Sequence, residues 1–185
     1  FIENTKADQR NFEIVTASFD GKLQKYANYQ PVWQKKLEEP ITAINSQIQL
    51  NNLVIGLQSG KIMVFSEDGD FITKDNLFQT SPVTTLEYSH DGQFLAAGYK
   101  SGKINIFMYQ NAELALDRNL PANNNPITAI DWTLLHNQGL RSQTSQFELQ
   151  VWDLTHKNRA EMTQNPLLMS EPWLSNNQGR QTGNE

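Results

Sequence analysis

The sequence repeats itself, and this repeat restricts the possible folds more than any other feature of the chain. A proline followed by an apolar residue and a threonine opens residues 40–44. The same pattern returns at 82–86 and again at 126–130, at spacings of 42 and 44 residues. A chain of this kind consists of one small structural unit that recurs along the sequence.

A second marker keeps step with the first. Residues 59–61 read Ser-Gly-Lys and return 42 residues later at 101–103, while Asp-Gly-Lys at 20–22 precedes them by 39. The next copy, at 145–153, is degenerate, because it has one extra residue and lacks the glycine. Two markers in the same order indicate a true repeat of the fold.

Each copy contains short runs of alternating apolar and polar residues, separated by Gly, Asn, Asp and Ser, which predicts strands and turns. In the clearest copy the predicted strands are 83–88, 94–98, 103–108 and 112–118, with a turn at 89–92. The last of these segments also contains residues that favour helix, but its place in the repeat predicts a strand. Four antiparallel strands in about 42 residues are typical of a β-propeller blade.

The third copy resembles a WD40 repeat. Residues 89–98 read Ser-His-Asp-Gly-Gln-Phe-Leu-Ala-Ala-Gly, and 101–107 supply the strand that follows. Trp152 and Asp153 form the dipeptide for which the repeat is named. The resemblance covers residues 11–162 and implies an all-β fold, a β-propeller of WD40 type.

The fourth copy carries a more specific resemblance. Residues 127–132 end in Asp-Trp, 140–142 read Leu-Arg-Ser, and 147–153 read Phe-Glu-Leu-Gln-Val-Trp-Asp. This segment is similar to a blade of the echinoderm microtubule-associated protein-like family, where a hydrophobic-Asp-Trp-Ser strand precedes Leu-Arg-Ser and a strand that begins Tyr-Glu. Thr133 replaces the serine here, and Phe147 replaces the tyrosine.

The repeat marks the expected blades with residues at their turns and strands. These markers are Asp20, Gly21, Ser59, Gly60, Asp91, Gly92, Ser101, Gly102, Asp131, Trp132, Trp152 and Asp153. In well-formed WD40 repeats an Asp between the second and third strands joins a buried hydrogen-bond network. Asp20 holds that place once, and serines replace it in the next two copies. We therefore expect apolar packing to dominate, with Phe65 and Phe107 standing where Trp152 stands.

The repeat predicts about 3.5 four-stranded blades. The expected units are 1–38 (the later strands of a first blade), 39–80 and 81–124 (two blades), 125–162 (a degenerate blade) and 163–185 (a tail or the start of a next blade). Propellers typically close with 4–8 blades, and an open arc leaves sheet edges unpaired. We therefore expect a fragment of a larger propeller, in which Phe1 is not the natural start.

Composition excludes several classes of protein. The absence of cysteine excludes disulfide frameworks, thiolate metal sites and cysteine nucleophiles. A net charge of −5 and a pI near 5.2 argue against a nucleic-acid partner, which needs Lys and Arg. The longest apolar runs, such as 53–55 and 94–97, are far shorter than the roughly 18 residues of a membrane span. We expect neither nucleic acid nor a membrane as a partner.

Local patterns that resemble catalytic motifs are better explained as turns. Residues 56–61 and 98–103 read Gly-x-x-x-Gly-Lys, but a phosphate loop needs four residues between its glycines and a helix after them. Residues 66–70 gather three carboxylates, without the bidentate Glu of a calcium loop. The histidines lie beside turn residues: His90, His136 and His156. We expect no enzyme activity, no metal and no cofactor.

A propeller without catalytic groups generally serves as an interaction platform, whose function depends on its surface. The resemblance implies a cytoplasmic, cytoskeletal component of a large assembly that binds tubulin, microtubules or neighbouring ciliary proteins, including those of the axoneme. The expected contacts lie in loops between second and third strands, at Gln58, Tyr99, Lys100 and Gln143.

Charge argues partly against this hypothesis, because the tubulin surface and this chain are both acidic. Contact would need local basic positions, for which the candidates are Lys22, Lys25, Lys35, Lys36, Lys100 and Lys103. The alternative is a generic WD40 scaffold in transport, ubiquitin ligation or signalling, without microtubule contact. A propeller hydrolase would need perturbed carboxylates in a polar pocket on the axis, and the sequence indicates none.

Overall fold

The computed structural model describes residues 2–5, 12–47, 50–73, 76–77, 79–111, 113–134, 137–155 and 161–162. Within these residues sixteen strands form four antiparallel sheets of four strands each. Every sheet consists of consecutive strands in chain order, so each is a meander. No helix in this part of the chain is long and apolar enough to cross a membrane.

We number the sheets as units 1 to 4. Unit 1 contains β1 (Ile2–Thr5), β2 (Phe12–Ala17), β3 (Lys22–Ala27) and β4 (Gln30–Lys36). Unit 2 contains β5 (Ile41–Gln47), β6 (Asn52–Leu57), β7 (Lys61–Ser66) and β8 (Asn76–Leu77). Unit 3 contains β9 (Val83–Tyr88), β10 (Phe94–Tyr99), β11 (Ile104–Gln110) and β12 (Glu113–Leu120). Unit 4 contains β13 (Ile127–Trp132), β14 (Gly139–Thr144), β15 (Leu149–Asp153) and β16 (Glu161–Met162).

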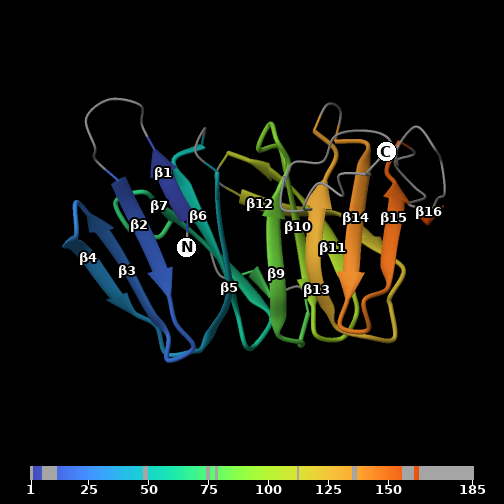
Figure 1. Ribbon diagram of the computed structural model, residues 1–185, viewed down its shortest axis with the longest axis horizontal. Helices are drawn as coiled ribbons and strands as arrows, with labels where there is room; N and C mark the ends of the chain where they lie inside the picture. The colour runs from blue at the N-terminus through green and yellow to red at the C-terminus, as the bar shows by residue number, and fades with distance from the viewer. Residues whose placement is uncertain are drawn as a thin grey trace, which may run out of the picture.

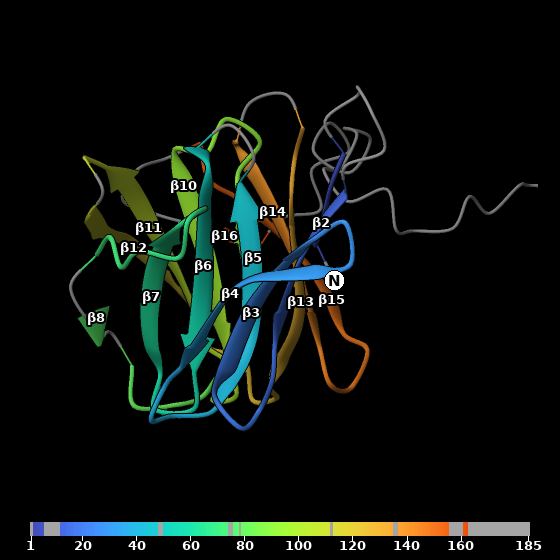
Figure 2. The ribbon, with the colours of Figure 1, turned by 90° about the vertical axis from the view of Figure 1, so that its left-hand side faces the viewer.

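The four units stand side by side in chain order, from unit 1 on the left of Figure 1 to unit 4 on the right. The first strands of units 2 to 4 lie together on the near side, where β9 contacts both β5 and β13. The later strands fan out behind them and to the sides, as Figure 2 shows from the left. This is the arrangement of blades around the axis of a β-propeller.

The strands of unit 3 confirm the prediction from the repeat. β9 covers the predicted 83–88, and the other three strands lie within two residues of their predicted bounds. β12 is a strand although its Ala, Glu and Leu favour helix, because it pairs with β11 from Gln110↔Glu113 to Ile104↔Leu120. The ladder of hydrogen bonds therefore overrides local propensity here.

Unit 1 differs from the expectation. The sequence predicts only later strands for residues 1–38, but β1 pairs with β2 from Ile2↔Val15 to Thr5↔Phe12 and completes a four-stranded sheet. The described chain therefore has four sheets where three and a half are predicted. Because β1 has only four residues, its alternation cannot be recognised in the sequence. Residues 163–185 lie outside the described part of the chain.

Apolar packing joins each unit to the next. The three buried clusters draw their members from units 1 and 2, units 2 and 3, and units 3 and 4 respectively. Phe65, Phe107 and Trp152 are at most 3% exposed. They pair with Leu53, Leu95 and Leu140 at equivalent places in their sheets. This confirms that the two phenylalanines stand where the tryptophan stands.

The recurring Ser-Gly-Lys marker has a steric cause. Gly102 has a φ of +82°, and a Cβ atom there would lie 2.0 Å from the backbone oxygen of Asn123. Asn123 N in turn donates a hydrogen bond to Gly102 O over 2.8 Å. The linker to the next unit therefore presses against this turn, and only glycine leaves room for it. Gly60 has the same role, with Gln79 O at 2.2 Å from such a Cβ.

Candidate interaction surfaces

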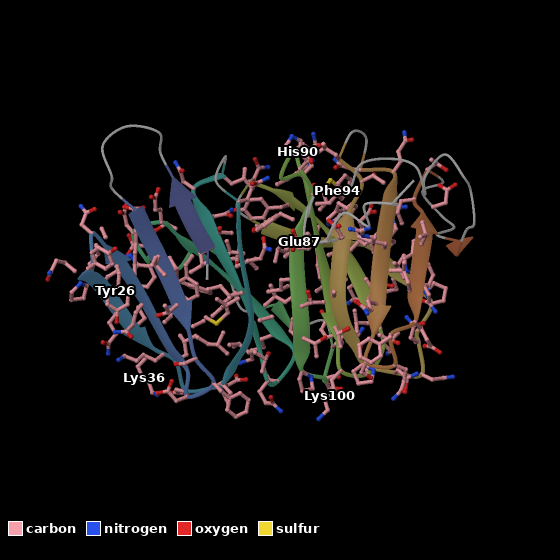
Figure 3. The ribbon with its side chains drawn as sticks, viewed as in Figure 1. Tyr26, Lys36, Glu87, His90, Phe94 and Lys100 are labelled. Atoms are coloured by element: carbon pink, nitrogen blue, oxygen red, sulfur yellow. The ribbon has the colours of Figure 1, made fainter. Side chains whose placement is uncertain are left out.

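The turns between second and third strands lie together at one end of the molecule, which we call the turn end. It consists of residues 18–21, 58–60, 100–103 and 145–148. Lys100 marks this end in Figure 3, and His90 lies at the opposite end. In units 2 to 4 a backbone bond fixes the turn to the proline that opens the unit; Lys100 N, for example, donates to Pro82 O over 2.9 Å. Side chains therefore repeat at equivalent places on a rigid edge.

The four predicted contact residues differ in their exposure to solvent. Gln58 and Lys100 are exposed at equivalent turn positions, while Gln143 is half-buried within β14. The prediction for Tyr99 is wrong, because its side chain is fully buried and belongs to the core between units 2 and 3. Tyr99 is the last residue of β10 and lies on the same face as Leu95 and Ala97, which belong to the same core. Alternation along the strand therefore turns its side chain inward.

Lysines at the turn end, or directly beside it, bring local positive charge to units 1 to 3. Lys22, Lys61 and Lys103 follow the turn glycine in these units, whereas Glu148 has this place in unit 4. Lys100 is exposed and has no ion pair within the described residues. Positive charge therefore concentrates on one side of the turn end although the chain as a whole is acidic.

Carboxylates neutralise part of this charge. Lys36 Nζ lies 3.0 Å from Asp20 Oδ2, and Lys61 Nζ lies 3.1 Å from Glu39 Oε1. The hydrogen bond from Ser18, followed by the contact with Lys36, lowers the pKa of Asp20 to about 2. Asp20 therefore stays ionised throughout the physiological range, and Lys36 is not free to attract a partner.

Unit 4 departs from this pattern at its turn. Phe147 stands where the other units have glycine, with a φ of 62° and 84% of its surface exposed. A linker that crossed this turn as the others do would meet the Cβ atom, as the hypothetical Cβ at Gly102 shows. The lost glycine was visible in the sequence, but the exposed aromatic ring was not predicted from it.

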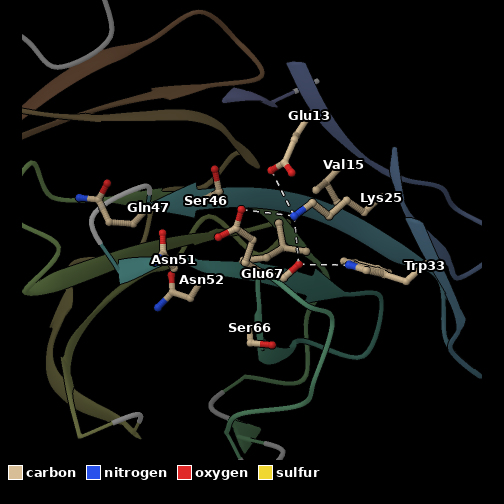
Figure 4. A pocket seen from close by; sticks show the side chains of 11 residues that line it. Glu13, Val15, Lys25, Trp33, Ser46, Gln47, Asn51, Asn52, Ser66 and Glu67 are labelled. Carbon is tan, nitrogen blue, oxygen red and sulfur yellow. Dashed lines mark hydrogen bonds and ion pairs between the residues drawn. The ribbon is translucent and has the colours of Figure 1, made fainter. Parts of the chain in front are cut away.

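A pocket lies between units 1 and 2, and we call it the interface pocket (Figure 4). Its volume is about 60 Å³. Lys25 enters it from β3 with 6% of its surface exposed, and its Nζ lies 3.2 Å from Glu13 Oε2 and 3.3 Å from Glu67 Oε1. Trp33 Nε1 donates to Glu67 O over 3.1 Å. Lys25 is therefore buried, which corrects its place among the basic surface candidates.

The repeat explains why the pocket is there. Ser46 is the sixth residue after the proline that opens unit 2, the position of Tyr88 in unit 3 and of Trp132 in unit 4. Glu13, in β2, has the place in its sheet that Phe94 has in β10. Between units 3 and 4 the rings of Phe94 and Trp132 stack with centroids 6.2 Å apart. Between units 1 and 2 a serine and a glutamate leave this volume open.

A polar ladder crosses the first strands of units 2 to 4, and its middle member, Glu87, is labelled in Figure 3. Asn45 Nδ2 donates to Glu87 Oε2 over 2.9 Å, and Arg141 Nε donates to Asp131 Oδ2 over 3.1 Å. Burial, and then the nearby charge of Asp131, raise the pKa of Glu87 to about 7. Sequence reasoning missed this carboxylate, although Asn45, Glu87 and Asp131 are equivalent positions of the repeat.

The ladder does not form a recognisable reaction centre. Glu87 lines neither the interface pocket nor the small pocket beside Trp132. In the described part of the chain no group of three or more His, Asp or Glu side chains could hold a metal ion. His136 and His156 lie outside the described residues, as does Trp173.

The remaining markers serve the local structure. Asp91 accepts hydrogen bonds from Ser89 Oγ over 2.8 Å and from Gln93 N over 3.0 Å, which closes the turn before β10. Trp152 Nε1 donates to Ser142 Oγ over 2.9 Å, and Asp153 accepts from Thr155. These residues stabilise turns and sheets.

Comparison with known proteins agrees with this architecture. The family model of the anaphase-promoting complex subunit 4 WD40 domain matches residues 70–134. Echinoderm microtubule-associated protein-like 1 of Rattus norvegicus, Homo sapiens and Mus musculus is 24% identical over 126 residues, 67% of this chain. The chain spans only 15% of the length of these relatives.

Among solved structures, the computationally designed Ika8 protein matches with a TM-score of 0.66 and 19% identity. The match covers 86% of this chain and 48% of that protein, and at this identity it shows the fold alone. The fan of four-stranded sheets, the recurring markers and the matching sequences lead to one conclusion. The chain is a WD40-repeat β-propeller that resembles the echinoderm microtubule-associated protein-like family.

Proposed function

We propose that this chain is a protein-interaction platform of the cytoskeleton that binds microtubules through its turn end. WD40 repeats serve as protein-interaction scaffolds, and the relatives in three mammals are named as microtubule-associated proteins. The observation that carries the proposal is the pair of exposed lysines at the turn of unit 3, Lys100 and Lys103, of which Lys100 has no ion pair among the described residues. An acidic surface, such as that of tubulin, is the partner that this charge fits.

The geometry supports binding by a rigid edge. Gln58 and Lys100 occupy equivalent turn positions in neighbouring units and are both exposed. Because backbone bonds already fix these turns, little conformational entropy is lost when a partner binds. The chain carries a net charge of −5, so the attraction is local and depends strongly on salt.

Sedimentation with taxol-stabilised microtubules tests the proposal. We expect the chain to pellet with microtubules at low salt and to be released as the salt concentration rises. Lys100→Gln removes one positive charge from the turn end and should weaken binding severalfold at low salt, as expected for a charged contact.

The matched control is Gln93→Glu, which changes the net charge by the same amount at the exposed opposite end. It should leave binding unchanged if the turn end is the contact. Equal weakening by both variants would mean that only net charge matters. Failure of the unchanged chain to pellet at low salt would end the proposal of direct binding.

A second candidate is a scaffold subunit in a different large assembly, without microtubule contact. The match of residues 70–134 to a WD40 domain of an anaphase-promoting complex subunit favours it. A cytoplasmic and cytoskeletal location belongs to the first candidate only. The ciliary location expected from the sequence gains no further support, and the proposal does not include it.

A further inference from the structure

We infer that the interface pocket between units 1 and 2 binds a cationic side chain, an arginine or a lysine, of a protein partner. The inference is independent of the microtubule proposal, because the pocket lies away from the turn end. Its lining includes Gln47, the last residue of β5, and Asn51, which precedes β6, and both lie at the end of the sheet opposite the turn.

The charge of the pocket favours a cation. Lys25 brings one positive charge, and the two carboxylates of Glu13 and Glu67 bring two negative charges. Lys25 is buried, whereas the side chains of Glu13 and Glu67 are 32% and 33% exposed. A partner therefore reaches the carboxylates first, and the pocket presents an excess of one negative charge to it.

The shape of the pocket favours a side chain with an apolar stem. Val15 and Leu53 line it together with the indole of Trp33, whose orientation is fixed by its bond to Glu67 O. A guanidinium or ammonium group near an indole gains cation–π attraction, and its methylene groups can pack on the aliphatic wall. A volume of about 60 Å³ suits the end of one side chain and is too small for a nucleotide or a cofactor.

The fold itself does not require these charges. Lys25 lies at the position that Val64, Ile106 and Val151 occupy in the third strands of the other units. Three units thus fold with an aliphatic residue where unit 1 buries a lysine. Burying charges costs free energy, and hydrophobic replacements of buried ion pairs are often neutral or stabilising. A polar group that the fold does not need is a candidate for function.

Titration with two matched probes tests the inference. N-acetyl-arginine amide carries the guanidinium group, and N-acetyl-citrulline amide has nearly the same shape without charge. The indole ¹⁵N–¹H signal of Trp33, assigned with Trp33→Phe, reports on the pocket. We expect a saturable shift with the arginine probe and at least about 10-fold weaker binding of the citrulline probe.

Glu13→Gln should weaken binding of the arginine probe toward the affinity of the citrulline probe, because it removes one of the two accessible carboxylates. Equal shifts with both probes, or none with either, would overturn the inference. A shift that is confined to signals remote from Trp33 would also overturn the inference.

Chemical rescue provides a second test that does not depend on weak binding. Lys25→Ala leaves two carboxylates without their cation, and n-propylammonium replaces the missing part of the lysine. We expect propylammonium to raise the Tm of this variant above its value in sodium chloride of equal ionic strength. The matched control is Val64→Ala, the same position in unit 2, which should gain nothing. Equal gains, or no gain in Lys25→Ala, would show that cations do not enter the pocket.

Discussion

The interface between units 1 and 2 is polar at positions where the interface between units 3 and 4 is apolar, although equivalent positions of the repeat form both. Phe94 and Trp132 stack at 29° between units 3 and 4, and Ile106 is buried beside them. At the equivalent positions between units 1 and 2 stand Glu13, Ser46 and Lys25. The strands and turns are the same in both places. The backbone of the repeat is therefore set by turns and ladders, and the side chains at this level can change from core to pocket.

The largest expected effect tests the apolar side of this comparison. Trp132→Ala removes a ring that is 1% exposed, stacks on Phe94 and donates Nε1–H to Glu87 O over 3.0 Å. We expect a loss of about 3–5 kcal/mol in the free energy of unfolding, from lost burial and the cavity left behind. Urea denaturation followed by circular dichroism measures it.

Trp33→Ala is the matched change on the polar side. Its ring is only partly buried and lines a pocket that is already open, so the loss should be clearly smaller. Equal losses for the two tryptophans would show that the two interfaces contribute alike to stability, and the comparison would fail.

The strands of both interfaces could be predicted from the sequence because their turn markers recur in register. The exceptions have local causes. β1 is too short for alternation to be recognised, and β10 extends one residue beyond its predicted end at Gly98, so that Tyr99 lies in the strand and faces the core instead of a loop. A period-two pattern defines the end of a strand poorly, because that end depends on the pairing with neighbouring strands.

The interface pocket could not be predicted, because its charged residues come from separate strands and from both units. Glu13, Lys25 and Glu67 are 12 and 42 residues apart in the sequence. A signal for it is nevertheless present. When the copies are superimposed by register, Lys25 falls at a position where the other units have Val64, Ile106 and Val151. A single lysine at a position that is otherwise aliphatic in the repeat indicates that the apolar core is interrupted there.

The next prediction concerns a feature that the two interfaces share. Gly102→Ala at the interface of units 3 and 4 places a Cβ atom 2.0 Å from Asn123 O, at a φ of +82°. We expect a loss of about 2–4 kcal/mol, from backbone strain and the displaced linker. Gly21→Ala, with Leu37 O at 2.6 Å and a φ of +86°, should cost a similar amount between units 1 and 2.

Thermal unfolding of the two alanine variants sharpens the comparison. Similar losses mean that the linker crossing is common to both interfaces and that only the side chains above it differ. A much smaller loss for Gly21→Ala would instead show that unit 1 is held more loosely by its whole backbone. Phe147→Gly in unit 4 is the converse change and should not destabilise, because it relieves a positive φ at an exposed residue.

The pH dependence of stability tests whether the interface of units 3 and 4 is apolar throughout. The folded chain raises the pKa of Glu87 from 4.5 to about 7, so the folded state binds the proton more tightly than the unfolded state. The contribution of Glu87 is most favourable below pH 4.5 and is lost as the pH rises through about 7. Between pH 5 and pH 8 this amounts to a loss on the order of 1–3 kcal/mol.

Glu87→Gln should remove this part of the pH dependence and raise stability at pH 8, while Asn45 keeps a hydrogen-bond partner. Measured unfolding free energies at pH 6 and pH 8 give the comparison. Parallel curves for the variant and the unchanged chain would show that Glu87 titrates normally. In that case the charged ladder would not weaken the interface of units 3 and 4.

The smallest expected effect belongs to the polar interface. Replacing the whole charged group at once, with Lys25→Met, Glu13→Gln and Glu67→Gln, keeps similar volumes and removes every charge from the pocket. The change in the free energy of unfolding should be within about 1 kcal/mol, because lost attraction is offset by lost desolvation cost. The aliphatic residues at the position of Lys25 in the other three units show that the repeat folds without this lysine.

Urea denaturation at pH 7 measures the change, and the arginine probe measures function in the same sample. A stable variant that no longer binds the probe separates the two roles of the interface. A loss as large as that of Trp132→Ala would mean that the charges hold units 1 and 2 together.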